Sequence, residues 1–570
     1  MIELKETYQV MRHKTITLVI ALANKIINEL NFVEIINRSV NWDANHWFLS
    51  PGQLAKALVL STFTDMRSPL THLQERLSAI DLSYLLGCEP DEHSVNAFNV
   101  GRTLDRIGDS DYSRSYETMT LTALQKYNIP TERIHADTTT VSFYGEYDIS
   151  TMKLTPEEKQ ELLRIEQGYN KDGRPNSHQV LVGQLVNETG IPLVNSTMDG
   201  STSDVEWNRQ ALDYFERLKQ HGFKEGLYVA DSKLVTSALV TRMNSAANRV
   251  SFVSRCPANF ANKLEHRTIE RAYVANNWES LGQLGSGKKA SSYRGISFTD
   301  HICGSQMRLL VLESSSLVAQ TNQLLEKEEA KLAPLIQELE KKEFACQADA
   351  EKEYIRFKKL KNLQLFEFTE AIEKHTHEKW PRGRRSASTR PTVTETYRIQ
   401  IEQITHNEEA CRKFISNKSC FVLISNVTDE TITNSELLGI YKGQHVVENS
   451  FRHLKGPNLA SAIFLKNPKR VEALMMLLTF ALLIRAIIQH RMRDGLKKHQ
   501  EESDEIIFAG WAGKPLERPT FKLLYEHSIN CYFERESFCE YTFQWPDVQT
   551  KELVVPLLKL MGLTVAELLQ

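Results

Sequence analysis

A short segment near residue 450 combines a phenol, an amide, a carboxylate and an amine at helical spacing. Tyr441, Gln444, Glu448 and Lys455 stand at offsets of 0, 3, 7 and 14 residues. At 100° per residue these positions lie within roughly 60° of one another, which predicts one polar stripe along a helix. A carboxylate between a phenol and an amine suits a metal ion beside a phosphate backbone. For the stripe alone, an amphipathic surface helix is the simpler interpretation.

Two further acids lie upstream, each in or directly after a segment with the composition of a strand. The run Ile134–Phe143 is rich in β-branched residues and carries Asp137 inside it, where an unpaired carboxylate is costly to bury. A short apolar run from Gly226 ends at Asp231, and a helical pattern follows. Either acid alone would be interpreted as a strand-end cap or a surface ion pair. Carboxylates on two strands and one helix can instead converge on divalent cations, because hard ions need oxygen ligands.

Asp137, Asp231 and Glu448, with the frame Tyr–x2–(Arg)–x3–Glu–x6–Lys, resemble the DDE transposases of bacterial insertion sequences, in the IS-four superfamily. The N-terminal region and the insertion resemble the branch of that superfamily numbered sixteen-thirty-four. The similarity extends through most of the chain and is strongest over residues 130–255 and 420–490. Other matching segments are 168–175 (Gly-Tyr-Asn-Lys-Asp-Gly-Arg-Pro), 179–186, 200–204 (Gly-Ser-Thr-Ser-Asp), 466–471 and 518–520.

The resemblance implies an α/β protein with an RNase H-like catalytic core, which cuts and joins DNA with two Mg²⁺ ions that Mn²⁺ can replace. Asp137 would bridge both ions, and Asp231 and Glu448 would each complete one. Water would first attack the phosphodiester at the end of the element, and the freed 3′-OH would then attack another strand. The implied partners are double-stranded DNA, as terminal inverted repeats and target, and a second copy of the chain. The implied location is the bacterial cytoplasm, on the nucleoid when DNA is bound, with no membrane partner.

The resemblance also assigns DNA contacts to the polar stripe. Tyr441 and Lys455 would hold phosphates next to the scissile bond. The family has Arg where this chain has Gln444, which can hydrogen-bond a phosphate but brings no charge. Lys442 or Arg452 could supply that charge instead.

Two histidines flank the candidate acids. His135 and His445 could each hydrogen-bond to a metal-ligating carboxylate and orient it. Strand alternation places His135 on the same face as Asp137, although packing in the core is its simpler role.

The first 250 residues divide into two predicted domains. Residues 1–125 read as helical, with Ser50-Pro51 as a helix start and another helix over residues 94–107. In the family such helices bind the terminal repeats; a helical bundle without a DNA role is the alternative. Residues 126–250 contain three strands, the second and third forming a hairpin, then a helix and a strand–helix unit. This order matches the first half of an RNase H-like core.

The gap of 217 positions between Asp231 and Glu448 is too long for a simple core and predicts an inserted domain at residues 251–418. Its first part has short β-like runs. Residues 317–374 are dense in Glu and Lys with apolar residues at helical spacing, which predicts a hairpin arm of long helices. The arm is either a solvated spacer or an element that reaches the partner subunit or its DNA.

A basic loop follows the arm. Arg382, Arg384 and Arg385 lie beside Trp380 and suit a phosphate backbone and an unstacked base. An exposed linker is the competing interpretation.

Residues 419–500 form the predicted second half of the core. The final strand of that core is expected at Phe421–Ser425, before the helix that carries Glu448. The apolar run Ala473–Ile484 is bracketed by Glu472 and Arg485 and is far shorter than a membrane span, so it reads as a buried helix. Residues 501–570 form a C-terminal tail without an assigned role.

Composition agrees with a large intracellular enzyme. The 570 residues are 41% hydrophobic and 25% charged, with a net charge of −3, so any basic surface must be local. The eight cysteines form no CxxC pair and the start of the chain does not read as a secretory leader, which argues against zinc and disulfides. Two other functions stay open: a metal-dependent nuclease without strand transfer, and a non-catalytic DNA-binding protein derived from a transposase.

Overall fold

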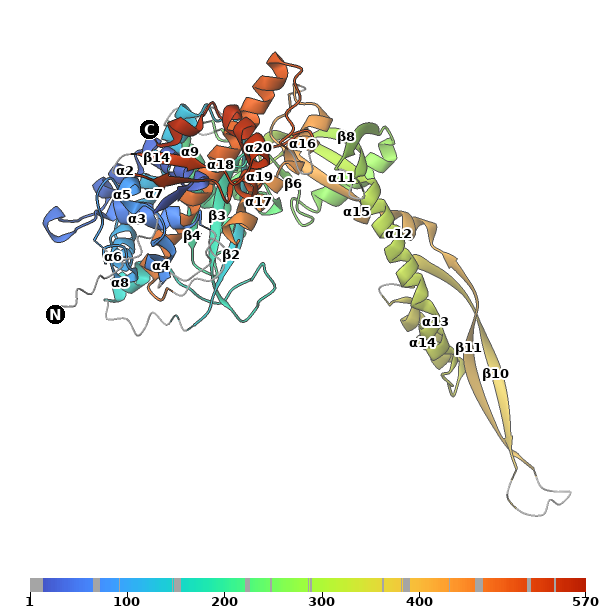
Figure 1. The fold of residues 1–570 in the computed structure, drawn as a ribbon. Helices are drawn as coiled ribbons and strands as arrows, with labels where there is room; N and C mark the ends of the chain where they lie inside the picture. Colours follow the sequence, from blue (N-terminus) through green and yellow to red (C-terminus); the bar gives the residue numbers. More distant parts are fainter. Residues whose placement is uncertain are drawn as a thin grey trace. The chain divides into compact units, whose positions relative to one another are not determined.

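The computed structural model divides into two compact units, which are drawn together in Figure 1. Unit 1 comprises Met1–Leu234, Ser245–Phe252 and Ile440–Gln570, and unit 2 comprises Val235–Asn244 and Val253–Gly439. The structure describes residues 14–64, 72–91, 93–145, 147, 155–220, 226–246, 249–285, 287, 290–360, 363–380, 382, 390–429, 431–456, 465–509, 514–537 and 540–569.

Unit 1 begins with a short strand, which was not predicted, and continues with the predicted helical region. Ser50 starts α3 with a capping box, in which Gln53 N donates to Ser50 Oγ over 3.2 Å and Ser50 N donates to the Gln53 side chain over 2.9 Å. The helix predicted at residues 94–107 begins slightly later, after the cap Asn96. The elements are β1 (Thr15–Thr17), α1 (Leu18–Glu29), α2 (Phe32–Ser39), α3 (Pro51–Ser61), α4 (Leu73–Leu77), α5 (Leu82–Leu86), α6 (Ala97–Gly108) and α7 (Tyr112–Lys126).

A sheet follows, with strands in the order β4-β3-β2-β5 within unit 1. These strands are β2 (Arg133–Phe143), β3 (His178–Asn187), β4 (Pro192–Met198) and β5 (Leu227–Ala230). β2 pairs antiparallel with β3 and parallel with β5, and β3 pairs antiparallel with β4. The predicted hairpin is confirmed, and its turn is fixed by the Asn187 side chain, which accepts bonds from the amides of Thr189 (3.1 Å) and Ile191 (2.8 Å).

Helices cover both faces of this sheet. On one face lies α9 (Asp204–Gln220), because the Trp207 ring packs so closely on β3 that a Cβ added to Gly183 would lie 2.4 Å from it. On the other lies α17 (His445–Leu454), whose Ser450 donates to Gln184 Oε1 over 2.8 Å. Neighbouring residues of a strand point to opposite faces, so these two contacts place α9 and α17 on opposite sides.

The apolar run near residue 480 lies inside α18 (Pro468–Glu502), which starts at the Asn467 cap with Pro468 in the first turn. An 18-residue window of this helix passes the length and composition test for a membrane span, and 83% of it is buried within the fold. α18 packs against α3, α6, α7 and β4. The Phe480 ring stacks on the Phe32 ring, with 4.5 Å between the ring centroids. The predicted core helix is confirmed.

The C-terminal residues belong to unit 1 rather than to a separate tail. They form α19 (Phe521–Ser528), β13 (Tyr532–Arg535), β14 (Tyr541–Gln544) and α20 (Val548–Leu560). β13 pairs with β1 near the other end of the chain, giving a sheet with the order β1-β13-β14. α20 packs on α18.

Unit 2 contains strands in the order β6-β12-β9-β8-β7. They are β6 (Phe252–Arg255), β7 (Glu279–Leu284), β8 (Ser291–Ile302), β9 (Ser305–Ser314) and β12 (Cys420–Ser425). The strand predicted at Phe421–Ser425 is present as β12. Its hydrogen-bonded neighbours are β6 and β9, both antiparallel, rather than the strands that carry the two aspartates.

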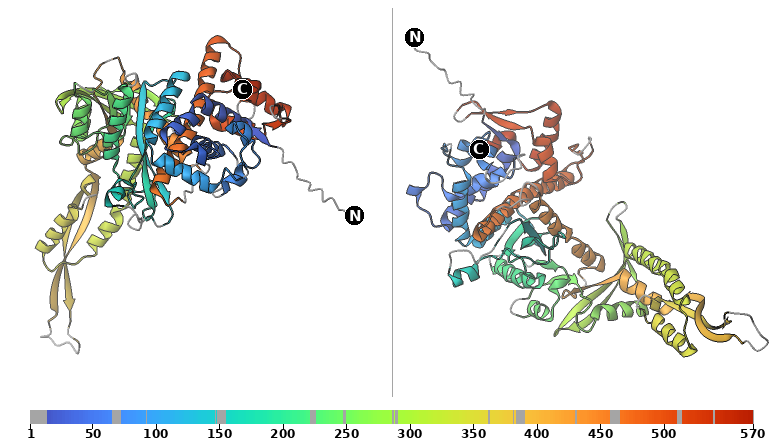
Figure 2. Two further views of the ribbon diagram at one scale, coloured as in Figure 1. Left: turned by 90° about the vertical axis from the view of Figure 1, so that its left-hand side faces the viewer. Right: turned by 90° about the horizontal axis from the view of Figure 1, so that it is seen from below.

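The arm of unit 2 is only partly helical. It contains α12 (Ser315–Ala330), α13 (Leu332–Glu340) and α14 (Gln347–Lys358), followed by β10 (Phe366–Lys379) and β11 (Thr392–His406). The two strands pair along their length as a ribbon that extends past the helices (Figure 2). The predicted helical arm is therefore wrong over residues 366–374. Phe366, Phe368 and Ile372 pack in or against a core shared with Ile399 of β11 and the arm helices. This packing, together with the pairing of β10 with β11, favours a strand over a helix.

The ribbon carries the predicted basic loop between its strands. Arg382 is exposed, and Arg384 and Arg385 lie outside the described residues.

Candidate functional site

Asp137 and Asp231 lie at the same level on neighbouring strands of unit 1. In the parallel pairing of β2 with β5, Ala136 stands opposite Ala230, so the next residue of each segment is an aspartate. β5 ends at Ala230, and Asp231 follows directly, accepting the amide of Lys233 over 3.0 Å. The chain between the two acids is thus folded so that both side chains lie at one end of β5.

Asp137 is in an environment that disfavours its charge. Burial raises the pKa of its carboxyl to about 6, partly offset by the Lys171 ammonium and the Thr138 amide. The pKa of Asp231 is also raised, again chiefly by burial. The charge of Asp204 raises both values further. Three carboxylates therefore share a region in which added positive charge would be favourable.

A lysine of the chain already supplies one positive charge there. Lys171 Nζ lies 3.1 Å from Asp204 Oδ1 and 4.0 Å from Asp137 Oδ1, and it donates to the Thr138 carbonyl over 3.0 Å. The Thr138 hydroxyl donates to Asp204 Oδ1 over 2.5 Å. The sequence expectations did not include Lys171 or Asp204, although both lie in matched segments, at 168–175 and 200–204.

The helix that carries Glu448 lies on the sheet face that carries Asp137. Asp137 pairs with Gln184 across β2 and β3, and directly opposed residues share a face. Since Gln184 is bonded by Ser450 of α17, the helix that carries Glu448 covers the Asp137 side. Glu448 itself is exposed. Among the residues that the structure describes, no three His, Cys, Asp or Glu side chains form a group that could hold a metal ion, so the three predicted ligands do not meet as one cluster.

The aspartates nevertheless fit a hard divalent cation. Their donor atoms are all carboxylate oxygens, which such ions prefer. The ammonium of Lys171 stands between Asp137 and Asp204 as a stand-in cation.

The predicted polar stripe is interrupted. α16 (Asn434–Lys442) ends before Gly443 and α17 begins at His445. Over the break the backbone hydrogen bonds join residues three positions apart instead of four. Gly443 N donates to Ile440 O (3.1 Å), and Val447 N donates to Gln444 O (3.2 Å). Tyr441 therefore lies on α16, while Glu448 and Arg452 lie on α17, and the expectation of one continuous helical stripe is wrong.

The opposite side of α17 is apolar and packs in the interior, because Val447, Phe451 and Leu454 are buried. Lys455 directly follows this helix. Its Nζ is paired with both oxygens of Asp172, at 2.7 and 2.9 Å. Arg452 donates to Asn449 Oδ1 over 2.8 Å and is exposed.

His135 packs in the interior beside the helix break. It is 1% exposed, and burial lowers its pKa to about 4, so the ring is neutral at pH 7. A Cβ added to Gly443 would lie 3.2 Å from its Cε1 atom, which shows how closely the turn covers the ring. His445 is exposed, with Nδ1 3.1 Å from the Lys442 carbonyl.

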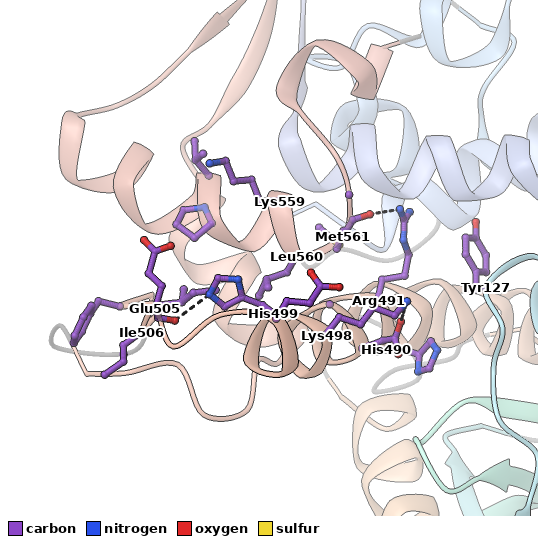
Figure 3. A pocket seen from close by; sticks show the side chains of 18 of the residues that line it. Tyr127, His490, Arg491, Lys498, His499, Glu505, Ile506, Lys559, Leu560 and Met561 are labelled. Carbon is purple, nitrogen blue, oxygen red and sulfur yellow. Dashed lines mark hydrogen bonds and ion pairs between the residues drawn. The ribbon is translucent and has the colours of Figure 1, made fainter.

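A separate cavity of about 1000 Å³ lies between the second half of α18 and α20 (Figure 3). Its wall carries both acidic and basic side chains, including the pair Lys498–Asp494 at 2.8 Å. Arg491 donates to the Met561 carbonyl there. The cavity contains none of the predicted site residues.

Comparisons with known proteins give a partial picture. A family model described as a domain of unknown function, DUF4277, matches residues 13–121, which cover α1 to α6 and most of α7. No curated protein matches the chain. Among solved structures, the chain is similar to a piggyBac transposase synaptic complex with hairpin DNA, solved by cryo-electron microscopy. The identity is 9%, the match covers 83% of this chain and 74% of that chain, and the TM-score is 0.35.

Proposed function

We propose that this protein is a DNA transposase, which cuts and joins the ends of an insertion sequence by phosphodiester hydrolysis and strand transfer. One observation carries the proposal. Asp137 and Asp231 are level on adjacent parallel strands, and the helix with Glu448 covers the Asp137 face. The motif resemblance to IS-four transposases gives the same three residues.

The sheet order supports an RNase H-like core. Three antiparallel strands are followed by a parallel strand, in the order β4-β3-β2-β5, with helices on both faces. The first acid lies within β2, between β3 and β5, and the second directly after β5.

In this proposal Asp137, Asp231 and Glu448 hold two Mg²⁺ ions, with Mn²⁺ as a substitute. When bound, such ions activate the attacking oxygen and relieve charge on the leaving oxygen. Asp137 and Asp231 contribute carboxylate oxygens from a rigid sheet. Glu448 contributes its carboxylate from the helix on the Asp137 face.

Other residues would position DNA. The Lys455 amine and the Tyr441 hydroxyl are the donors for phosphates near the scissile bond, with Gln444 and Arg452 beside them on the same segment. The protein forms no covalent bond to DNA in this scheme and acts by positioning and electrostatics. The proposed partners are the terminal inverted repeats, target DNA and a second copy of the chain, and the proposed location is the bacterial cytoplasm.

A cleavage assay tests the function. The substrate is a duplex that carries the inverted repeat flanking the gene, incubated with the full chain and Mg²⁺. A transposase gives nicked DNA and joined product. A nuclease without strand transfer gives nicks only, and a non-catalytic binding protein gives a shifted duplex without cleavage.

The matched variants are Asp137→Asn and Asp231→Asn, which keep side-chain shape and remove charge. Each should reduce cleavage by at least about a hundredfold. End binding should be retained, because phosphate and base contacts come from other residues. Asp213→Asn, at a half-buried position on α9, is the control and should cleave like the wild type. Full cleavage by Asp137→Asn would refute the assignment.

A further inference from the structure

One loop of unit 1 neutralises two different charges of the candidate site. Lys171 reaches Asp137 and Asp204, at 4.0 and 3.1 Å, and the next residue, Asp172, pairs with Lys455 at 2.7 and 2.9 Å. The segment Gly168–Pro175 therefore brings a cation to the carboxylates and an anion to the amine. The motif comparison matched this segment but gave it no chemical role.

The loop is fixed to the sheet by its own side chains. Asn170 Nδ2 donates to Ser142 Oγ over 3.0 Å and to Gln179 Oε1 over 2.9 Å. The Lys171 amide donates to Thr140 Oγ1 over 3.1 Å. The bonds attach the loop to β2 and β3, so the direction of Lys171 and Asp172 is set by the core.

Asn170 also closes the turn from inside. Its Oδ1 accepts the amides of Asp172 (2.9 Å) and Arg174 (3.1 Å), which ties Asp172 to the same anchor as Lys171. Because the two charged residues are adjacent in one braced turn, a displacement of Lys171 is expected to disturb Asp172.

Close backbone packing joins this loop to the segment that supplies Asp204. A Cβ on Gly168 would lie 2.1 Å from the Gly200 carbonyl oxygen, and one on Gly200 would lie 2.3 Å from the Gln179 carbonyl oxygen. Only glycine permits such approaches. The two matched segments, 168–175 and 200–204, thus form one unit in which Lys171 meets Asp204.

We propose that Lys171 and Asp172 are place-holding charges of the site, which means that each occupies a charged group until a ligand replaces it. A divalent cation replaces Lys171 beside Asp137, and a DNA phosphate replaces Asp172 beside Lys455. The inference rests on the proposed function, since it takes metal and DNA as the incoming groups. Asp204 retains Lys171 after the exchange. Because the two residues share one turn, metal binding should also strengthen DNA binding, and DNA should strengthen metal binding by the same factor.

The first experiment measures Mn²⁺ binding to the full chain without DNA, from the electron paramagnetic resonance signal of free Mn²⁺. Lys171→Met should lower the Kd at least about fivefold, because a competing charge is removed next to Asp137. Lys171→Arg keeps the charge and should bind like the wild type. Lys233→Met is the matched control, since it removes a charge near Asp231 that only acts through space. An equal gain in Lys171→Met and Lys233→Met would overturn the proposal, as would no gain in Lys171→Met.

The second experiment measures binding of a short mixed-sequence duplex in EDTA at several salt concentrations. Asp172→Asn should tighten binding and steepen the salt dependence by about one unit of slope, because Lys455 becomes available to a phosphate. Asp109→Asn is the control, since it releases Lys469 from a similar pair, at 2.6 Å, elsewhere in unit 1. Adding Lys455→Met to Asp172→Asn should cancel the gain. Unchanged binding in Asp172→Asn would overturn this half of the proposal even if a Lys171 variant failed to fold.

The outcomes separate this inference from the proposed function. If Mn²⁺ binds to the wild type and Asp137→Asn abolishes binding, while Lys171→Met changes nothing, only the place-holding role fails. If Mn²⁺ binds to neither the wild type nor Lys171→Met, the metal site of the proposed function fails with it. Cleavage of end DNA by the wild-type chain is scored separately, in the assay that tests the proposed function.

Discussion

At the scale of single residues, the site is defined by charged groups that the fold brings together at a cost in free energy. Asp137 is held in a position where burial dominates its electrostatics, with only Lys171 and a backbone amide to offset that effect. Functional sites commonly contain such perturbed carboxyl groups, because the protein holds them for a ligand rather than for its own stability. The buried neutral ring of His135 behaves differently: it packs against the Gly443 turn and has no charge to offer at pH 7.

The raised pKa of Asp137 has a consequence for stability that a melting experiment can detect. The folded pKa, about 6, exceeds the ordinary aspartate value of 3.8, so the folded state binds the proton more tightly than the unfolded state. The contribution of Asp137 to the free energy of unfolding is therefore fully present below about pH 4, and it is lost as the pH rises toward 6 and above. In EDTA, Asp137→Asn should raise the Tm at pH 7.5 by several degrees relative to the wild type, with a smaller gain at pH 5.

The control for this prediction is Asp213→Asn, which changes a half-buried carboxylate 3.8 Å from Arg209. Its Tm should differ little from that of the wild type at either pH. A lower Tm for Asp137→Asn at pH 7.5 would show that the ionised carboxylate, paired with Lys171, stabilises the folded state.

At the scale of elements, the sequence correctly predicted those helices and strands whose conformation depends on residues nearby in the chain. The β-branched run around Asp137 forms β2, the Ser50-Pro51 pair starts α3, and the apolar run near residue 480 lies in a buried helix. The failures are non-local. Residues 366–374 carry a helical pattern but form a strand because β11 pairs with them, and the stripe at 441–455 breaks at Gly443, where the turn packs on His135. Lys171 and Asp204 were missed because their contact with Asp137 exists only after the loop and sheet assemble.

The contact between α9 and the sheet gives a prediction at this scale. A Cβ on Gly183 would lie 2.4 Å from the Trp207 ring, which is 1% exposed and cannot move freely. Gly183→Ala should therefore destabilise unit 1 by about 1–3 kcal/mol and lower the Tm. Gly439→Ala is the control: nothing lies within 4 Å of its added Cβ, and it sits in α16, so it should be neutral or slightly stabilising. Equal Tm values for the two variants would mean that the ring has room to shift.

At the scale of the whole molecule, the predicted acid site and the arm belong to different units. Every predicted residue of the acid site and the Lys455 segment belongs to unit 1, although the sequence between Asp231 and Glu448 is mostly unit 2. Unit 2 contributes its own strands and an arm with a separate apolar core, formed by α13, α14 and the base of the ribbon. Such an arm can be altered without removing any residue of the acid site.

The ribbon offers the sharpest test of what unit 2 adds. Replacing residues 376–395 by an Asn-Gly turn removes the end of the ribbon and the predicted basic loop, and it leaves the paired residues Glu373–Arg398 and the core around Ile399 intact. The shortened chain should keep the wild-type Tm, because few apolar groups are lost. If the loop contacts DNA, end binding should weaken and its salt dependence should flatten, by about one unit of slope for each removed Lys or Arg that contacts a phosphate, with Arg382, Arg384 and Arg385 as the predicted contacts.

A second variant separates charge from length. Changing Arg382, Arg384 and Arg385 to Gln within the full-length ribbon removes only their charges. This variant should reproduce the part of the change in salt slope that these three arginines cause. If the arginine variant binds like the wild type while the shortened chain binds weakly, the ribbon acts through its length, as an arm toward the partner subunit, and the loop does not hold phosphates. If neither change affects end binding, the arm is a spacer, and the DNA contacts must come from unit 1, where Lys455 is the first residue to examine.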